Sequence, residues 1–182
     1  MNKIIALTFL FLCLIPITGH AKPYDIDTNK SHIAFSGTHA GNEFNGEFEK
    51  WTAQIDFDEN KLDTSTATII LYTGEAKTGN VMYDGTLPTQ DWFDTNAYPT
   101  IIFIAKQFDK TDTGYAVTGE LAVKGITKSI TIDFDLSGND VKTVTAQFPV
   151  DRLAYNIGVE SDPNAEWVGQ IITVDMTLVT TN

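Results

Sequence analysis

The sequence predicts an all-β protein, and three observations carry this prediction. Apolar and polar residues alternate along most of the chain, as in Trp51 to Phe57 and Ile172 to Leu178, and a period of two is typical of strands with one buried face. β-Branched and aromatic residues fill these runs, as strands prefer. Turn signals such as Lys124-Gly125 separate them. About nine or ten antiparallel strands of this kind favour a barrel or sandwich over an open sheet.

The chain begins with an expected export signal over residues 1–21. A short basic start precedes an apolar run from Ile4 to Ile17, and small residues stand at Gly19 and Ala21, so cleavage is expected after Ala21. The only cysteine, Cys13, lies inside this run. The remainder, residues 22–182, is therefore free of cysteine, which excludes disulfides and thiolate chemistry, and its length suits a single domain.

The elements that follow are mostly strands. The expected strands cover residues 23–27, 31–39, 42–49, 51–58, 66–75, 99–109, 114–124, 127–137, 141–150 and 167–180. Residues 77–97 break the alternation and are expected to form a short helical, lid-like insertion that could gate the interior. The segment 101–104 is apolar on both faces, so its outer face is expected to meet either the insertion or a second subunit.

Charge narrows the range of partners. The chain carries 12 Lys+Arg against 24 Asp+Glu, a formal net charge of −12, which becomes −13 once Lys3 leaves with the signal. Such a charge disfavours nucleic acid and anionic membrane surfaces as partners. No stretch after the signal is long and apolar enough to insert stably in a bilayer.

Candidates for catalysis or metal binding are weak. His32 and His39 are seven positions apart in one expected strand, which places them on opposite faces and argues against a shared metal. The carboxylates of Glu160, Asp162 and Glu166 lack a neighbouring nucleophile in the sequence. Arg152, the only arginine, could hold a polar head group through its fork of donors, although an ordinary ion pair with a carboxylate is favoured. We therefore expect no catalytic residues, no metal and no cofactor.

The abundant apolar and aromatic residues leave two interpretations open. A barrel of about eight strands or more can enclose an apolar ligand, or the same side chains can pack a dry core. The alternating pattern does not choose between them.

Several motifs together resemble the YceI-like family. They are YDID at 24–27, SHIAF at 31–35, GEF at 46–48, TGN at 78–80, WFD at 92–94 followed by YPTIIF at 98–103, and YAVTGELAVKGITK at 115–128. Each is a weak strand-and-turn motif, but their order over about 160 residues is specific. Two positions depart from the family pattern: Val81 to Leu87 replace a charged stretch, and Lys124 replaces a histidine.

The resemblance implies an extended antiparallel, lipocalin-like barrel whose interior holds a polyisoprenoid chain, such as a quinone or an isoprenoid precursor. It also implies a periplasmic location and often a homodimer, and a membrane redox partner would suit a quinone ligand. The expected ligand-lining residues are Phe35, His39, Phe44, Phe48, Ile69, Leu71, Trp92 and Phe103, with Arg152 as a candidate head-group contact.

The function expected from all this is that of an exported carrier for a lipophilic small molecule, without catalysis. One alternative is an enzyme that acts on a lipophilic substrate through His39 or the carboxylates of residues 160–166. Another is a barrel without a ligand that inhibits or scaffolds a second protein.

Overall fold

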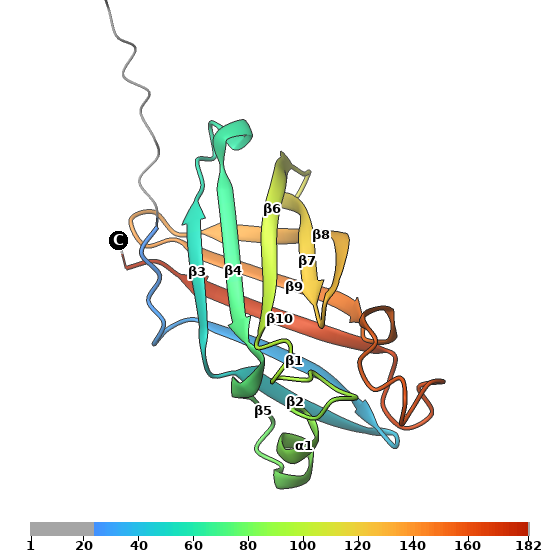
Figure 1. Ribbon diagram of the computed structural model, residues 1–182. Coiled ribbons are helices and arrows are strands. Elements are labelled where there is room, and N and C mark those ends of the chain that lie inside the picture. The colour runs from blue at the N-terminus through green and yellow to red at the C-terminus, as the bar shows by residue number, and fades with distance from the viewer. Residues whose placement is uncertain (1–23, 182) are drawn as a thin grey trace, which may run out of the picture.

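The computed structural model describes residues 24–181, and it consists of one curled antiparallel sheet (Figure 1). Its strands follow the order β3-β4-β6-β7-β8-β9-β10-β1-β2-β5. Their bounds are β1 His32–His39, β2 Asn42–Phe48, β3 Trp51–Asp56, β4 Thr66–Tyr72, β5 Ala76–Lys77, β6 Thr100–Lys110, β7 Tyr115–Val123, β8 Ile126–Ser137, β9 Thr143–Asp151 and β10 Ile171–Val179. The predicted all-β, lipocalin-like architecture is confirmed.

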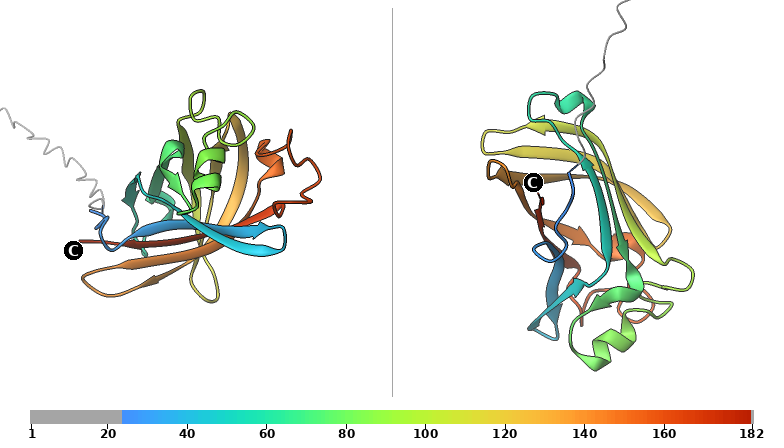
Figure 2. Two further views of the ribbon diagram at one scale, coloured as in Figure 1. Left: turned by 90° about the horizontal axis from the view of Figure 1, so that it is seen from below. Right: turned by 90° about the vertical axis from the view of Figure 1, so that its left-hand side faces the viewer.

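The sheet folds back on itself along β8. The first part of this strand pairs with β7 from Val123↔Ile126 to Tyr115↔Phe134, whereas its last three residues pair with β9. Strands β3, β4, β6 and β7 therefore form one wall, and β9, β10, β1 and β2 form the facing wall (Figure 2). Side chains on the inner faces of both walls make the core.

The N-terminal segment joins the two walls at one end. The Tyr24 amide donates to the carbonyl of Ile55 in β3 at 2.8 Å, and the Asp27 amide donates to the carbonyl of Val179 in β10 at 2.8 Å. Residues 24–27 thus occupy the expected place but form isolated bridges rather than a strand, because they cross from one wall to the other instead of following either. Residue 23 of the expected strand lies outside the described residues.

An aromatic end cluster of Phe57, Phe108, Tyr115 and Phe134 packs beside this segment. Its ring centroids lie 5.2 to 6.3 Å apart, mostly in edge-to-face geometry, which aromatic pairs prefer. Phe57, Phe108 and Phe134 of this cluster line the interior at this end of the walls.

The opposite end carries the helical insertion predicted near 77–97. Helix α1 spans Val81–Thr86, and the Asn80 side chain caps it by accepting from the amides of Met82 and Tyr83. Asn at this position satisfies amides that have no partner within the helix. Asp84 Oδ1 in turn accepts from both the amide and the hydroxyl of Thr78 at 2.7 Å, which fixes the entry of the chain into the helix.

Two predicted strands extend three residues or more beyond one end of the observed ones. The strand expected over 66–75 ends at Tyr72, where a 3-10 turn begins, because the Thr73 amide and hydroxyl bind the carbonyls of Pro99 and Tyr98. The strand expected over 167–180 begins only at Ile171. The preceding residues run beside the end of β1, where the Ala40 amide donates to the Trp167 carbonyl at 2.7 Å.

The outer face of the segment 101–104 is partly exposed. Ile104 on this face remains 41% exposed, whereas Ile102 is half-buried. Both expectations for this face, contact with the insertion and contact with a second subunit, stay predictions.

Candidate functional site

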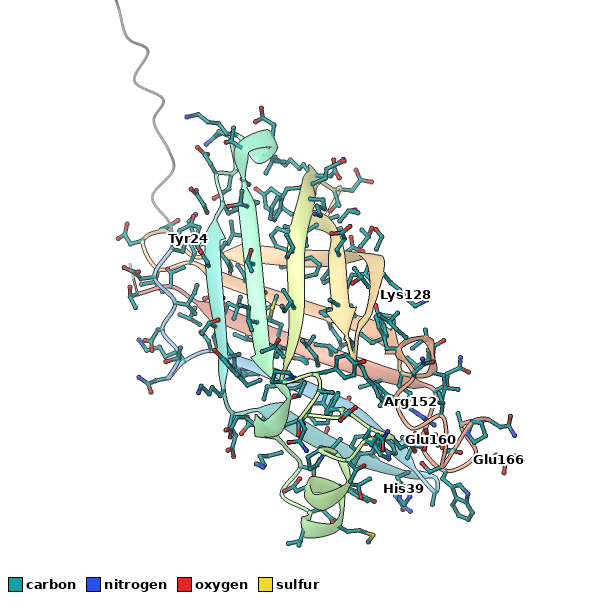
Figure 3. All side chains as sticks on the ribbon, viewed as in Figure 1. Tyr24, His39, Lys128, Arg152, Glu160 and Glu166 are labelled. Atoms are coloured by element: carbon teal, nitrogen blue, oxygen red, sulfur yellow. The ribbon has the colours of Figure 1, made fainter. Side chains whose placement is uncertain are left out.

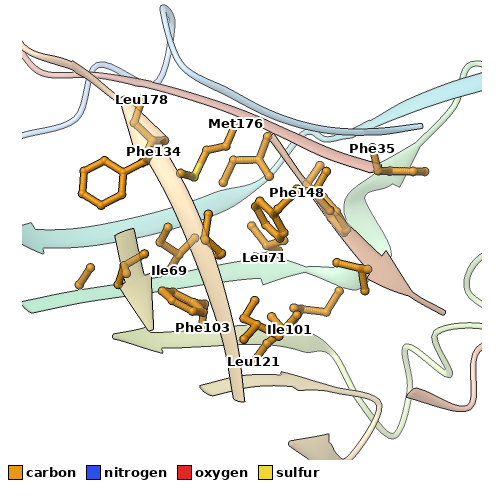
Figure 4. Close-up of a pocket in the computed structure, with 18 of the residues that line it drawn as sticks. Phe35, Ile69, Leu71, Ile101, Phe103, Leu121, Phe134, Phe148, Met176 and Leu178 are labelled. Atoms are coloured by element: carbon orange, nitrogen blue, oxygen red, sulfur yellow. The ribbon is translucent and has the colours of Figure 1, made fainter. Parts of the chain in front are cut away.

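An apolar cavity lies between the two walls and follows the length of the molecule. Its volume is about 200 Å³. This is more than ten times the volume of about 10–15 Å³ that a cavity needs to hold one water molecule. Both walls line it, as Figure 4 shows for Ile69 and Leu71 of β4, Phe103 of β6, Phe148 of β9 and Met176 of β10. A cavity with this lining has no polar partners to hold ordered water.

Glycines on neighbouring strands explain how aromatic rings line the cavity without filling it. Gly37 lies directly opposite Phe44, and a Cβ atom added to Gly37 would stand 2.9 Å from Phe44 Cζ. A Cβ on Gly119 would stand 2.5 Å from Phe103 Cζ and 2.6 Å from the carbonyl oxygen of Ile104. These rings therefore lie against bare backbone, where a side chain in place of hydrogen would push them into the cavity.

The insertion and the loop of residues 152–170 form one end of the cavity. Leu87, Trp92 and Phe93 from the insertion and Ile157 from the loop all line it. Asp91 holds these two segments together, because its carboxylate accepts from the amides of Glu160 and Ser161 at 2.9 and 3.0 Å. Burial raises the pKa of Asp91, but its hydrogen bonds with Ser161 and Glu160 outweigh this, so the net shift is downward.

Most of the residues predicted to bind a ligand do lie on the cavity wall. The seven that the structure brings together there are Phe35, Phe44, Phe48, Ile69, Leu71, Trp92 and Phe103. Their contact with a ligand stays a prediction.

His39 is placed differently, and its predicted position on the lining is wrong. It shares a strand face with Phe35, but it is the last residue of β1 and lies beyond the end of the lining. Its Nδ1 atom forms a hydrogen bond of 2.9 Å with the Tyr83 hydroxyl of α1. The alternation along β1 predicts the correct face of the strand for His39. The cavity, however, does not extend as far along this face as His39.

Arg152 forms a structural ion pair. The residue is 1% exposed, and its Nη2 atom lies 2.7 Å from Asp162 Oδ2. Figure 3 shows Arg152 at the same end of the molecule as Glu160 and Glu166. The guanidinium also donates to the carbonyls of Ile157, Gly158, Val168 and Gly169, besides that of Asp162. No N–H group is left for a head group, so the favoured alternative of an ordinary pair is the one observed.

Asp162 organises the same loop from its other side. Burial raises the pKa of this carboxyl, but amide hydrogen bonds from Val168, Trp167 and Glu166 and the charge of Arg152 outweigh it and lower the pKa overall. Asp162 is therefore ionised at neutral pH and occupied in holding the loop, which removes it as a general base.

Sequence reasoning missed several lining residues. Met176 and Phe148 stand on the apolar faces of alternating runs, so the alternation could have identified them as lining residues. Lys142 and Glu59 form an ion pair of 2.9 Å at the end beside the N-terminal segment, and the aliphatic part of Lys142 reaches the cavity wall. These two residues are 83 positions apart, and no local pattern joins them.

Within residues 24–181, no group of three His, Cys, Asp or Glu side chains is arranged to hold a metal ion. The same residues contain no helix of the length and apolarity that crossing a membrane requires.

A curled antiparallel sheet with an apolar cavity between its walls defines a lipocalin-like, barrel-type protein. The family model described as the YceI-like domain matches residues 24–180, and the chain belongs to this family. A UPF0312 protein of Vibrio campbellii is 30% identical over 147 residues, which are 77% of this chain and 78% of that protein. Protein YceI of Shigella flexneri is 24% identical over 184 residues, 96% of each chain.

Solved structures share the fold. BcnA of Burkholderia cenocepacia superposes with a TM-score of 0.83 and 26% identity, over 86% of this chain and 100% of that one. A protein of Saccharophagus degradans, described as a polyisoprenoid binding domain implicated in plant cell wall breakdown, superposes with a TM-score of 0.65 and 15% identity, over 86% and 96% of the two chains.

Proposed function

We propose that this protein is an exported, periplasmic carrier that holds the tail of an amphipathic polyisoprenoid, or of a similar lipid, between its two walls. The observation that carries the proposal is the cavity, which is long, apolar and lined from both walls. Apolar cavities exclude water and accept hydrocarbon. The fold shared with a polyisoprenoid binding domain supports the same ligand class.

The energetics of burial favour a long tail. Each buried CH₂ contributes about 0.8 kcal/mol, so one isoprene unit offers a gross ~3–4 kcal/mol. A few units then offset the cost of immobilising the chain. The location rests on the expected signal at residues 1–21, which lie outside the described residues.

Binding is favoured over catalysis by the state of the charged groups on the wall. Among the described residues that line the cavity, only Lys142 and Arg152 carry charge, and each is ion-paired. A catalytic acid or base needs a proton that it can exchange with the substrate, and neither pair offers one to the cavity. A second subunit and a membrane redox partner remain part of the proposal without a structural observation of their own.

Mass spectrometry of an organic extract tests the proposal on protein purified from its native host. We expect one intact prenyl lipid, or a similar long-chain lipid, for each protein chain. A product that accumulates with time would instead favour the enzyme alternative. The absence of any extractable lipid would favour the scaffold alternative and contradict the carrier.

A further inference from the structure

Three tips of the chain lie together at the end of the molecule that carries the insertion. They are the start of helix α1, the turn between β1 and β2, and the last part of the loop of residues 152–170 (Figure 1). The Tyr83 hydroxyl of α1 is bonded to His39 of β1 at 2.9 Å, and the amide of Ala40 in the turn donates to the carbonyl of Trp167 in the loop at 2.7 Å. The three tips therefore form one surface, which we call the insertion end.

Large apolar side chains are exposed on two of these tips. Val81 and Met82, the first two residues of α1, are 89% and 69% exposed, and Trp167 of the loop is 62% exposed. No residue of α1 is buried, so the helix offers these side chains to solvent instead of adding them to the core. Exposed apolar side chains that gather on one part of a protein indicate an interaction site.

The chain segments that contain these tips lack basic side chains. Residues 31–49, 78–105 and 153–181 contain neither Lys nor Arg. Their acidic residues include Glu160 and Glu166, which Figure 3 shows at this end. Proteins that bind anionic lipid surfaces by charge present clusters of Lys and Arg. The insertion end offers the opposite charge, so any membrane that it meets should carry no net negative charge.

Two lysines lie near this end without forming a basic patch. Lys77 of β5 donates to the carbonyl of Gly74 at 3.4 Å. Lys124, in the turn between β7 and β8, donates to the carbonyls of Asp91 and Asn156, both at 2.7 Å. Each ammonium group is engaged with the protein's own backbone.

A lipid bilayer fits this surface better than a second protein does. Trp side chains prefer the interface between water and the membrane interior, and separate apolar tips can enter that interface without a complementary surface. A stable protein interface needs about 1,200–2,000 Å² of matched contact, whereas the apolar residues of the insertion end stand on separate tips.

The insertion end also adjoins the cavity. Leu87 directly follows α1, and both Leu87 and Trp92 of the insertion line the cavity. Under the proposed function, the ligand is dissolved in a membrane before the protein binds it. Contact between this end and the bilayer would shorten the path of a lipophilic ligand through water.

Building on the proposed function, we infer that the insertion end docks on the surface of a lipid bilayer whose head groups carry no net charge. Val81, Met82 and Trp167 enter the interfacial layer of the bilayer. Three side chains bury little apolar area, so the contact is shallow and reversible.

Co-sedimentation with sucrose-loaded vesicles tests the inference on the purified chain. We expect binding to vesicles of phosphatidylcholine and weaker binding when anionic phosphatidylglycerol is mixed in. Stronger binding to the anionic mixture would overturn the inference. Failure to bind either kind of vesicle would also overturn it and would leave a protein as the partner of this end.

Variants locate the contact. The triple variant Val81→Ser, Met82→Ser, Trp167→Ser should lower the partition coefficient on phosphatidylcholine by at least about tenfold. The control is Ile104→Ser with Val141→Ser, because these side chains are 41% and 45% exposed and Val141 lies in the turn between β8 and β9, at the opposite end of the walls. The control should bind as the unmodified chain does, and equal losses in the two variants would overturn the assignment of docking to the insertion end.

Ligand binding is measured separately on the same variants, by displacement of the fluorescent probe N-phenyl-1-naphthylamine with geranylgeraniol. The triple variant should bind geranylgeraniol as the unmodified chain does, because none of the three residues lines the cavity. If the unmodified chain bound geranylgeraniol but no vesicle, the docking inference would fail and the carrier function would stand. If it bound vesicles through these residues but not geranylgeraniol, the carrier function would fail and the docking surface would stand.

Discussion

Replacement of Asp162 by alanine should lower the free energy of unfolding by about 3–5 kcal/mol, because it leaves a buried charge without its partner. Arg152 and Asp162 are 1% and 5% exposed, so solvent cannot replace the lost carboxylate. The same substitution also removes the acceptor for the amides of Glu166 and Val168. The loop that closes one end of the cavity would then lose its anchor.

Urea unfolding at neutral pH measures this effect. Glu120→Ala is the control, because its ion pair with Lys106 is half exposed and such pairs contribute less than about 1 kcal/mol. Equal losses in the two variants would show that the Arg152–Asp162 pair does not hold the loop.

The same pair predicts a dependence on pH. The pKa of Asp162 is lowered in the folded chain from its ordinary value of 3.8, so its carboxylate stabilises the fold fully above that value. The contribution is lost as the pH falls through the lower, folded pKa. The difference in stability between the unmodified chain and the Asp162→Ala variant should therefore be constant near neutrality and shrink below about pH 4.

Ile69→Trp should abolish binding of a long tail, with a loss of affinity of at least about a hundredfold (2.7 kcal/mol or more). Ile69 of β4 lies opposite Phe103 of β6 and lines the cavity, so an indole ring would occupy the path of the tail. The interior is close-packed elsewhere, so the ring has no other place to go. Displacement of the neutral fluorescent probe N-phenyl-1-naphthylamine by geranylgeraniol reports the affinity.

The adjacent residue offers a matched control. Ile70 points away from the cavity, because successive side chains of a strand alternate between faces, and it is not part of the lining. Ile70→Trp should bind the lipid as the unmodified chain does. If both variants bound normally, the tail would not lie between the walls.

The walls of the cavity could be predicted from the sequence because their signal is local. Phe35, Ile69 and Phe103 stand in expected strands and among the expected lining residues, and each lines the cavity. His39 shows the limit of this reasoning, since parity fixes the face of a strand but not the point at which the cavity ends. The Tyr83 hydroxyl that His39 contacts belongs to the insertion, 44 positions away.

The ends of the cavity could not be predicted in the same way. The Lys142–Glu59 pair joins the turn before β9 to the loop after β3, and a contact across the barrel leaves no periodic trace in the sequence. The cavity also depends on glycines of neighbouring strands, against which large aromatic rings pack. Gly119 occupies an apolar-face position of the alternating run from Tyr115 to Val123, and nothing in that pattern shows that its missing side chain provides the space for Phe103.

A crystal structure of the protein purified from its native host tests the central claim most directly. Continuous density for a hydrocarbon chain should run between the walls, past Ile69 and Phe103. Walls found collapsed onto each other, with the lumen filled along its whole length by the protein's own side chains, would contradict it.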